Sequence, residues 1–222
     1  MDKYNSLGLT GFDLKIIAMV SMLIDHVGYV FFPDIIVFRI VGRLAFPIFC
    51  FCLAEGAYYT SNIRKYEFRL LVFALLSEIP FDYGLYHELW QPGHQNVFFT
   101  LLCGLLVIDI SRSFGRKLGA VAFVILGFLS VACKFDYQIM GVSFVVIFYF
   151  MKDAEQKYRG PLFVGLLNFA ANATRIQAFA SVACILILFY NGEKGRGVKW
   201  LFYLFYPLHL AVIGIVYANL LS

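Results

Sequence analysis

Side chains able to do acid-base chemistry stand inside stretches of this sequence that are otherwise apolar. A histidine with carboxylates in reach can serve as a general base, a proton relay or a nucleophile. An arginine beside them can stabilise an oxyanion or hold a phosphate. We therefore take six residues as candidates for a catalytic site: Asp25, His26, Arg43, Glu78, Asp82 and His209.

Asp25 and His26 are adjacent in the apolar run 16–32, where ionisable groups are costly. An Asp at the centre of a membrane helix costs about 2.5–3.5 kcal/mol on insertion scales, so a chain keeps one there mainly for function. No spacing such as His-x3-His indicates a metal site, so we expect no metal.

The composition indicates which solvent surrounds the chain. Of the 222 residues, 61% are hydrophobic and 14% are charged, and the mean hydropathy is +0.79. Such a chain cannot present a water-facing surface around one core, so we expect an integral protein of the cell (inner or plasma) membrane, in contact with the lipid bilayer. The net charge of +4 does not indicate nucleic acid, because the basic residues fall in the links between apolar runs.

The apolar runs predict an all-α bundle of about nine transmembrane helices that forms a single domain over residues 1–222. The seventh run is short for a full crossing, and Asn168, Asn172 and Thr174 near its end suggest a tilted or partly re-entrant segment. The predicted spans are 14–32, 36–58, 67–85, 96–111, 117–133, 137–151, 160–172, 175–190 and 198–220.

The positions of Lys and Arg predict the orientation of a multi-pass protein. With the N-terminus in the cytoplasm, only Arg39, Arg43, Lys134 and Arg175 of the 18 basic residues fall toward the outside. Cytoplasmic links are enriched in Lys and Arg, so we expect a cytoplasmic N-terminus and an outer C-terminus. The residues on the inner side are Lys3, Lys15, Arg64, Lys65, Arg69, Arg112, Arg116, Lys117, Lys152, Lys157, Arg159, Lys194, Arg196 and Lys199.

Sequence position converts to depth, because each helical residue rises about 1.5 Å through a core of about 30 Å. His26, Glu78, Asp82 and His209 fall at roughly 15–21 Å from the inner face on this scale, and Arg43, counted from the outer face on a descending helix, comes to roughly 18 Å. Facing lipid, each would be costly, so we expect the five side chains to converge inside the bundle and to satisfy one another.

Structural roles are open for several of these residues. His209 could simply hydrogen-bond a neighbouring backbone carbonyl. Arg39 and Arg43 are four residues apart on one helix face and could pair with Asp82 and Glu78.

The orientation of His26 needs a partner from another helix. Asp25 is next to it in sequence and points about 100° away, so it is poorly placed for this role. Glu78 or Asp82 could orient the imidazole instead.

Other polar and sulfur side chains receive no catalytic role. His87, Glu88 and His94 lie in an outer link, where we expect surface or substrate-access roles only. Cys50 and Cys103 lie in apolar runs and are expected to be packing residues outside the cluster.

Several strings in this sequence resemble the TraX family, which includes the inner-membrane protein associated with N-terminal acetylation of conjugative pilin. The similarity extends over nearly the whole chain. The strings are IDHVG at 24–28, GRLAFPIF at 42–49, AEG at 54–56, SEIPFD at 77–82 and YLFYPLH at 203–209.

This resemblance implies a membrane acyltransferase that takes an acyl group, acetyl in the first instance, from cytoplasmic acyl-CoA to an acceptor on the far side. It implies that His26 deprotonates an acceptor amine or hydroxyl or carries the acyl group, and that Arg43, in its Arg-x3-Pro string with Pro47, faces the thioester oxyanion. The acceptor does not carry over: a surface glycan, a lipid and an exported peptide N-terminus all remain open.

Basic residues in the inner links could bind the phosphates of acyl-CoA, the expected co-substrate, although the topology alone also explains them. These residues are Arg64, Lys65, Arg69, Arg112, Arg116 and Lys117.

Two other classes of function remain open. A proton-coupled transporter also places His, Asp and Arg at mid-membrane, but the inverted repeats or matched broken helices that favour it are not found in the sequence. An assembly factor would use the buried charges only to lock helices together.

Overall fold

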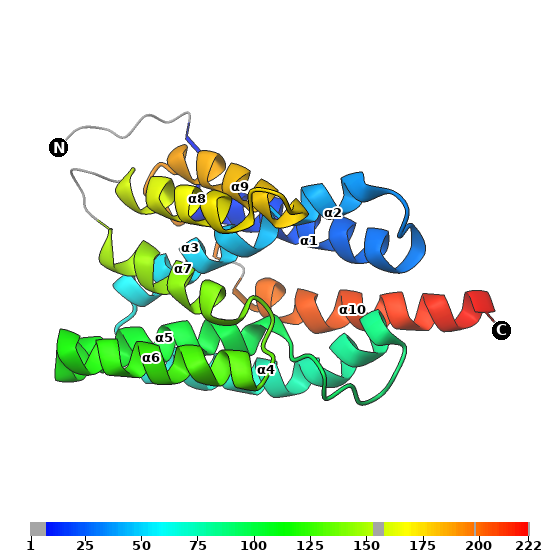
Figure 1. Ribbon diagram of the computed structural model, residues 1–222, viewed down its shortest axis with the longest axis horizontal. Coiled ribbons are helices and arrows are strands. Elements are labelled where there is room, and N and C mark those ends of the chain that lie inside the picture. Colours follow the sequence, from blue (N-terminus) through cyan, green and yellow to red (C-terminus); the bar gives the residue numbers. More distant parts are fainter. Residues whose placement is uncertain (1–7, 153–157, 198, 222) are drawn as a thin grey trace.

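A computed structural model describes residues 8–152, 158–197 and 199–221, and the described part is all-helical apart from isolated bridges (Figure 1). The helices are α1 Gly11–Phe31, α2 Ile36–Gly42, α3 Ala45–Tyr59, α4 Ile63–Tyr86, α5 Val97–Phe114, α6 Arg116–Ala132, α7 Gln138–Phe150, α8 Arg159–Asn172, the 3-10 helix η1 Ile176–Phe179, α9 Ala180–Leu188 and α10 Lys199–Leu221.

The helices coincide with the predicted apolar runs when α2 with α3 and η1 with α9 are each taken as one segment. Within the described residues, four segments are long and apolar enough to cross a membrane, which is consistent with a multi-pass membrane protein: Gly11–Phe31, Ile36–Tyr59, Val97–Phe114 and Trp200–Leu220. Helices α7 and α8 have 13 and 14 residues, short of the roughly 20 that a full crossing needs. The prediction of nine crossings is therefore not confirmed.

Local sequence explains where several helices begin. Thr10 and Asp13 form a reciprocal capping box at the start of α1. The side chains of Asn62 and Asn96 accept hydrogen bonds from backbone N–H groups at the starts of α4 and α5.

Helices α4 and α10 lie in close contact, which positions the polar residues of α10. A Cβ atom at Gly84 would lie 2.5 Å from the Leu210 carbonyl oxygen, and one at Gly214 would lie 2.4 Å from the Tyr83 ring. Only glycine permits this approach, as at other close membrane-helix crossings.

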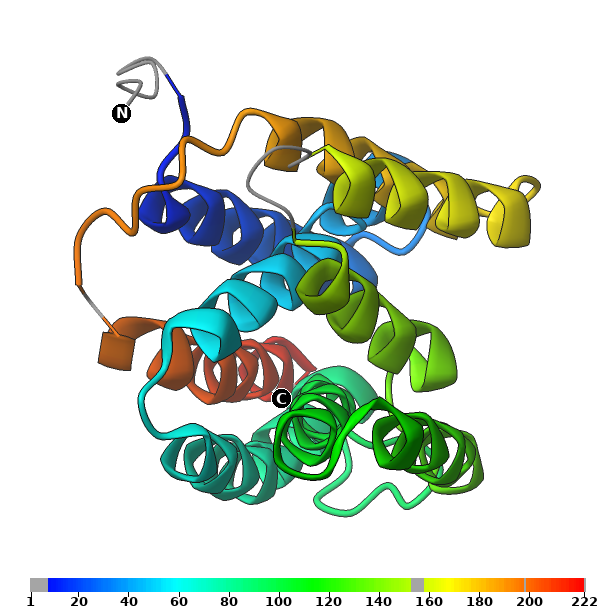
Figure 2. The same cartoon turned by 90° about the vertical axis from the view of Figure 1, so that its left-hand side faces the viewer.

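The helices form two groups joined by α3 and α7. Figures 1 and 2 show α8 and α9 beside α1 and α2 on one side, and α4, α5, α6 and α10 on the other. Helix α3 contacts α1, α7 and α9, while α7 contacts α5 and α6.

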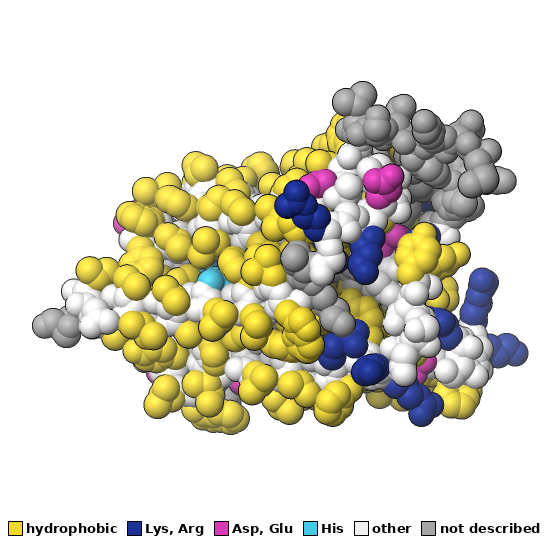
Figure 3. Space-filling model, turned by 180° about the vertical axis from the view of Figure 1, so that it is seen from behind, with side chains coloured by type: hydrophobic (Ala, Val, Ile, Leu, Met, Phe, Trp, Pro, Cys, Tyr) yellow, Lys and Arg dark blue, Asp and Glu magenta, His cyan; other side chains and the backbone are white. Residues whose placement is uncertain are grey.

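Charge gathers at one end of the molecule. Figure 3 shows Lys and Arg side chains together at that end and hydrophobic side chains over most of the remaining visible face. The links 60–62, 115 and 189–197 lie toward this basic end, and the links 32–35 and 87–96 lie toward the opposite end (Figure 1). Lys3 and Lys157, also assigned to the inner side, lie outside the described residues, as does the Lys199 side chain.

We expect reporter fusions after Ser61, Arg116 and Lys194 to report a cytoplasmic location, and fusions at Glu88 and after Ser222 to report an outer one. The physical reason is the excess of basic residues in the three links that carry the fusions after Ser61, Arg116 and Lys194. Ser222 itself lies outside the described residues, so its fusion tests the predicted outer C-terminus independently. A cytoplasmic signal from the C-terminal fusion would contradict an odd number of crossings.

Candidate functional site

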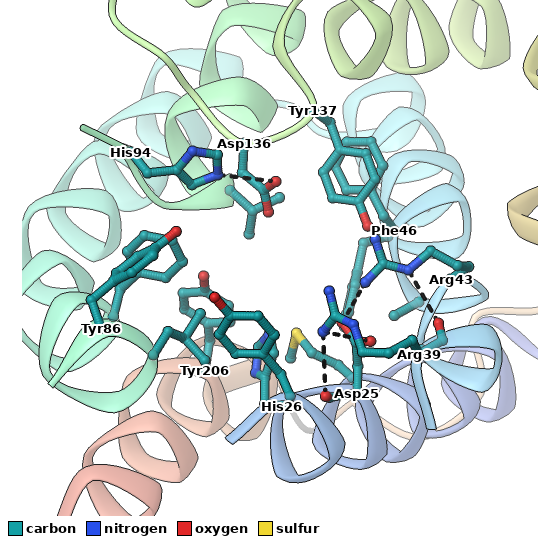
Figure 4. A pocket seen from close by; sticks show the side chains of 18 residues that line it. Asp25, His26, Arg39, Arg43, Phe46, Tyr86, His94, Asp136, Tyr137 and Tyr206 are labelled. Carbon is teal, nitrogen blue, oxygen red and sulfur yellow. Dashed lines mark hydrogen bonds and ion pairs between the residues drawn. The ribbon is translucent and has the colours of Figure 1, made fainter. Parts of the chain in front are cut away.

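A cavity of about 250 Å³ lies between α1, α2, α3, α4 and α10 and is closed in part by the links before α5 and α7 (Figure 4). Its charged and imidazole side chains come from four of these segments. They are Asp25, His26, Arg39, Arg43, His94 and Asp136, and tyrosines 29, 86, 137 and 206 complete the polar lining.

One carboxylate on this cavity faces two guanidinium groups. Asp25 Oδ1 lies 3.0 Å from Arg39 Nη1, and Asp25 Oδ2 lies 2.7 Å from Arg43 Nη2. Gly42 makes the approach possible, because a Cβ there would lie 2.2 Å from the Asp25 Cβ. The ion pairs thus join α1 to the junction of α2 and α3.

The two arginines differ in how fully they are bound. All three side-chain nitrogens of Arg43 have acceptors: Nε donates to the Arg39 carbonyl at 3.2 Å, Nη1 to Gln177 Oε1 at 3.1 Å and Nη2 to Asp25. Arg39 uses Nη1 only, toward the Asp25 carboxylate and its backbone carbonyl, and its guanidinium lies over the Tyr29 ring at 4.8 Å. Arg43 therefore connects three elements, α1, α2 and η1.

We expect Arg43→Lys to lower the thermal midpoint of the purified protein more than Arg39→Lys does. A lysine ammonium cannot reproduce three divergent bonds, and each lost bond to a charged group costs about 1.5–3 kcal/mol. Thermal unfolding in one detergent measures both variants. Equal midpoints for the two variants would show that the additional contacts of Arg43 contribute no more stability than those of Arg39.

The two histidines of the sequence-based site are in direct contact. His26 Nδ1 lies 2.7 Å from His209 Nε2, and His209 Nδ1 lies 2.7 Å from the Phe205 carbonyl oxygen. A carbonyl only accepts, so neutral His209 donates from Nδ1 and accepts at Nε2. His26 then donates from Nδ1, and its Nε2 carries the free lone pair. His26, the member of the pair that lines the cavity, is therefore in the tautomer that a base or nucleophile requires.

Glu78 and Asp82 do not line this cavity. Glu78 accepts a hydrogen bond from the Asn96 amide, and Asp82 accepts one from the Gln91 backbone N–H at 2.8 Å. The interpretation that they pair with the two arginines is wrong, because Asp25 occupies that position. His26 is likewise hydrogen-bonded to His209 rather than to either carboxylate.

Sequence analysis gave no catalytic role to two link residues that line this cavity. His94 Nε2 lies 3.6 Å from Asp136 Oδ1 at the cavity, and backbone bonds join Gln95 to Lys134 and Asp136. The Thr100 hydroxyl also donates to the Asp136 carbonyl. The two links are about 40 residues apart, so no local pattern indicates that they meet. His94 therefore lines the site rather than only the surface of an outer link.

The ion pair between His94 and Asp136 should make stability depend on pH. Interaction with the Asp136 carboxylate raises the pKa of His94 above its usual value, against the opposing effect of burial. A raised pKa in the folded state stabilises the protein fully below the unfolded value of about 6.5 and loses this effect as pH rises through the folded value. We expect the midpoint difference between wild type and Asp136→Asn to be largest below pH 6 and to shrink above it. A difference independent of pH would exclude the pair as its cause.

The expected acyl-CoA ligands belong to the N-terminal part of α4, the first turn of α6 and the last turn of α5, and none of them lines the cavity that holds His26. Arg112 donates to the Ala57 carbonyl at 2.9 Å, and Arg69 lies over the Tyr66 ring. Arg116 lines a second, mainly apolar cavity of about 490 Å³ between α5, α6, α7 and α8. Arg64, Lys65 and Lys117 are exposed.

Among the described residues, no three His, Cys, Asp or Glu side chains are grouped so that they could hold a metal ion. Cys50 and Cys103 are buried and lie outside the lining of the first cavity.

The fold and the cavity define a multi-pass type of membrane protein with a polar site enclosed by its helices. The chain belongs to the TraX family, because the family model described as "TraX protein" matches residues 11–217. A probable fimbrial assembly protein, FimC of serogroup H1, from Dichelobacter nodosus is 30% identical over 94% of this chain and 96% of its own length. An uncharacterized protein, RP591, from Rickettsia prowazekii (strain Madrid E) is 33% identical over 30% of this chain and 25% of its own length. No solved structure matches.

Proposed function

We propose that this protein is a membrane acyltransferase that moves an acyl group, in the first instance acetyl, from cytoplasmic acyl-CoA to an amine or hydroxyl acceptor. The single observation that carries the proposal is the His26–His209 contact, which leaves His26 Nε2 unprotonated at a cavity. Membership of the TraX family supports it.

In this proposal His26 acts as the general base. Its Nε2 takes the proton of the acceptor N–H or O–H while the acceptor attacks the thioester carbonyl. The new C–N or C–O bond forms, the C–S bond breaks, and the departing CoA thiolate receives the proton from His26. His209 holds the ring of His26 in the required tautomer. A variant of this route has His26 Nε2 carry the acyl group transiently, which needs the same lone pair.

The two substrates approach from different ends in this proposal. The basic end offers charges for the phosphates of acyl-CoA, with Arg64, Lys65, Arg69, Arg112, Arg116 and Lys117 as its proposed ligands. The acceptor enters the first cavity from the end that carries the links 32–35 and 87–96. The relative from Dichelobacter nodosus is a probable fimbrial assembly protein, so a fimbrial subunit is one acceptor to test.

The test is acyl transfer by the purified protein in nanodiscs. Acetyl-CoA carrying a labelled acetyl group is supplied with fimbrial peptides, glycans or lipids, and mass spectrometry follows both free CoA and labelled acceptor. Time-dependent labelling of one acceptor class supports the proposal. Release of no CoA with any acceptor class, by protein shown to be folded, would contradict it and favour the transporter.

A further inference from the structure

Arg39 has hydrogen-bonding capacity that the protein itself does not use. Within the described part of the chain, its Nε and one terminal nitrogen, Nη2, have no acceptor, whereas every side-chain nitrogen of neighbouring Arg43 has one. Figure 4 shows the Arg39 guanidinium projecting into the cavity, and its side chain is 28% exposed. The contact with the Tyr29 ring holds the guanidinium plane while leaving its edge free.

The side of the cavity around Arg39 carries an excess of positive charge. Asp25 supplies one negative charge against the two positive charges of Arg39 and Arg43. The other cavity carboxylate, Asp136, lies 3.6 Å from His94 and, within the described residues, forms no ion pair with either arginine. Among low-dielectric helices, an uncompensated guanidinium is costly unless an anion binds beside it.

We propose that this cavity binds an acceptor that carries a carboxylate or phosphate group, and that Arg39 is the ligand for that anion. A guanidinium edge presents two parallel N–H donors that match either group. The inference rests on the proposed function in taking the bound molecule to be the acyl acceptor. It also separates the two arginines: Arg39 binds substrate, and Arg43 positions α1, α2 and η1.

Three small probes test the proposal by binding alone. Phosphoethanolamine and β-alanine carry an amine with a phosphate or a carboxylate, and ethanolamine carries the amine without an anion. With protein in phosphatidylcholine nanodiscs, we expect the two anionic probes to bind at least about tenfold more tightly than ethanolamine, as a charge-assisted pair predicts. Equal affinity for all three probes would overturn the proposal.

Variants assign the binding to Arg39. Arg39→Gln should weaken phosphoethanolamine binding about tenfold or more, and Arg39→Lys should weaken it less because the charge remains. Arg175→Gln is the matched control, since Arg175 is exposed and lies outside the lining of the cavity. Unchanged binding by Arg39→Gln would overturn the proposal, and should that variant fail to fold, unchanged binding of β-alanine by Arg39→Lys would do so.

One further measurement distinguishes a lipid headgroup from a soluble anion as the natural ligand. A second distinguishes failure of the anion site from failure of the proposed acyltransferase. Replacing part of the phosphatidylcholine by phosphatidylethanolamine should weaken soluble probe binding if a lipid headgroup is the natural ligand, and should leave it unchanged if a soluble or peptide anion is. Probe binding that depends on Arg39 without any acyl transfer would contradict the acyltransferase alone. Acyl transfer that is insensitive to Arg39→Gln would contradict the anion site alone.

Discussion

His26→Ala protein should lose acyl transfer from acetyl-CoA by about 10²–10⁴-fold while remaining inserted and folded, because removal of a general base typically has this effect. The reason lies in the hydrogen bonds of the pair, which leave Nε2 of His26, a residue that lines the cavity, with a free lone pair to act as the base. Release of CoA and labelling of the acceptor measure the loss, and thermal unfolding in the same nanodiscs measures the fold.

His87→Ala is the matched control for this experiment. His87 is an exposed histidine that follows α4, stacks on the Tyr217 ring and lies outside the lining of the cavity. Its loss should leave transfer at the wild-type rate. Wild-type transfer by well-folded His26→Ala protein would refute the mechanism and shift the proposed function to the transporter.

Asp25→Asn should lower stability by about 3–5 kcal/mol, the usual effect of removing one partner of a buried ion pair. The substitution keeps the shape of the side chain but leaves Arg39 and Arg43 without their carboxylate. Asp34→Asn removes the same charge from an exposed position in the link after α1 and should change stability little. Unfolding in increasing concentrations of a denaturing detergent measures the stability of the wild type and of both variants.

A double variant distinguishes uncompensated charge from lost hydrogen bonds. Asp25→Asn combined with Arg39→Gln removes one carboxylate and one guanidinium, so it should recover part of the stability lost in Asp25→Asn alone. If the double variant were less stable than the single one, the surplus positive charge would not be the cause.

The sequence predicts where the helices lie and which of them carry the site, because apolar length and the cost of buried charge are local properties. Asp25, His26 and Arg43, which the sequence singles out, lie together at one cavity, and their catalytic role stays a prediction. The sequence does not predict the partners, since depth along a helix leaves rotation about the axis undetermined. Glu78 matches His26 in depth yet turns toward Asn96 at the start of α5.

The link residues to which sequence analysis gave no catalytic role lie where hydropathy carries no information. His94 and Asp136 are polar residues in links, where polarity is the ordinary condition. Their meeting at the cavity depends on how α5, α6 and α7 return the chain, which is a tertiary property.

The contact between His26 and His209 joins α1 to α10, the first and the last of the helices that the structure describes. During synthesis, His26 enters the membrane near the beginning, while its partner emerges from the ribosome roughly 180 residues later. A nascent chain that ends before α10 therefore holds His26 with no group to fix its tautomer. If the proposed mechanism holds, acyl transfer requires α10 to be in place, so a translation product that lacks α10 should be inactive by this route.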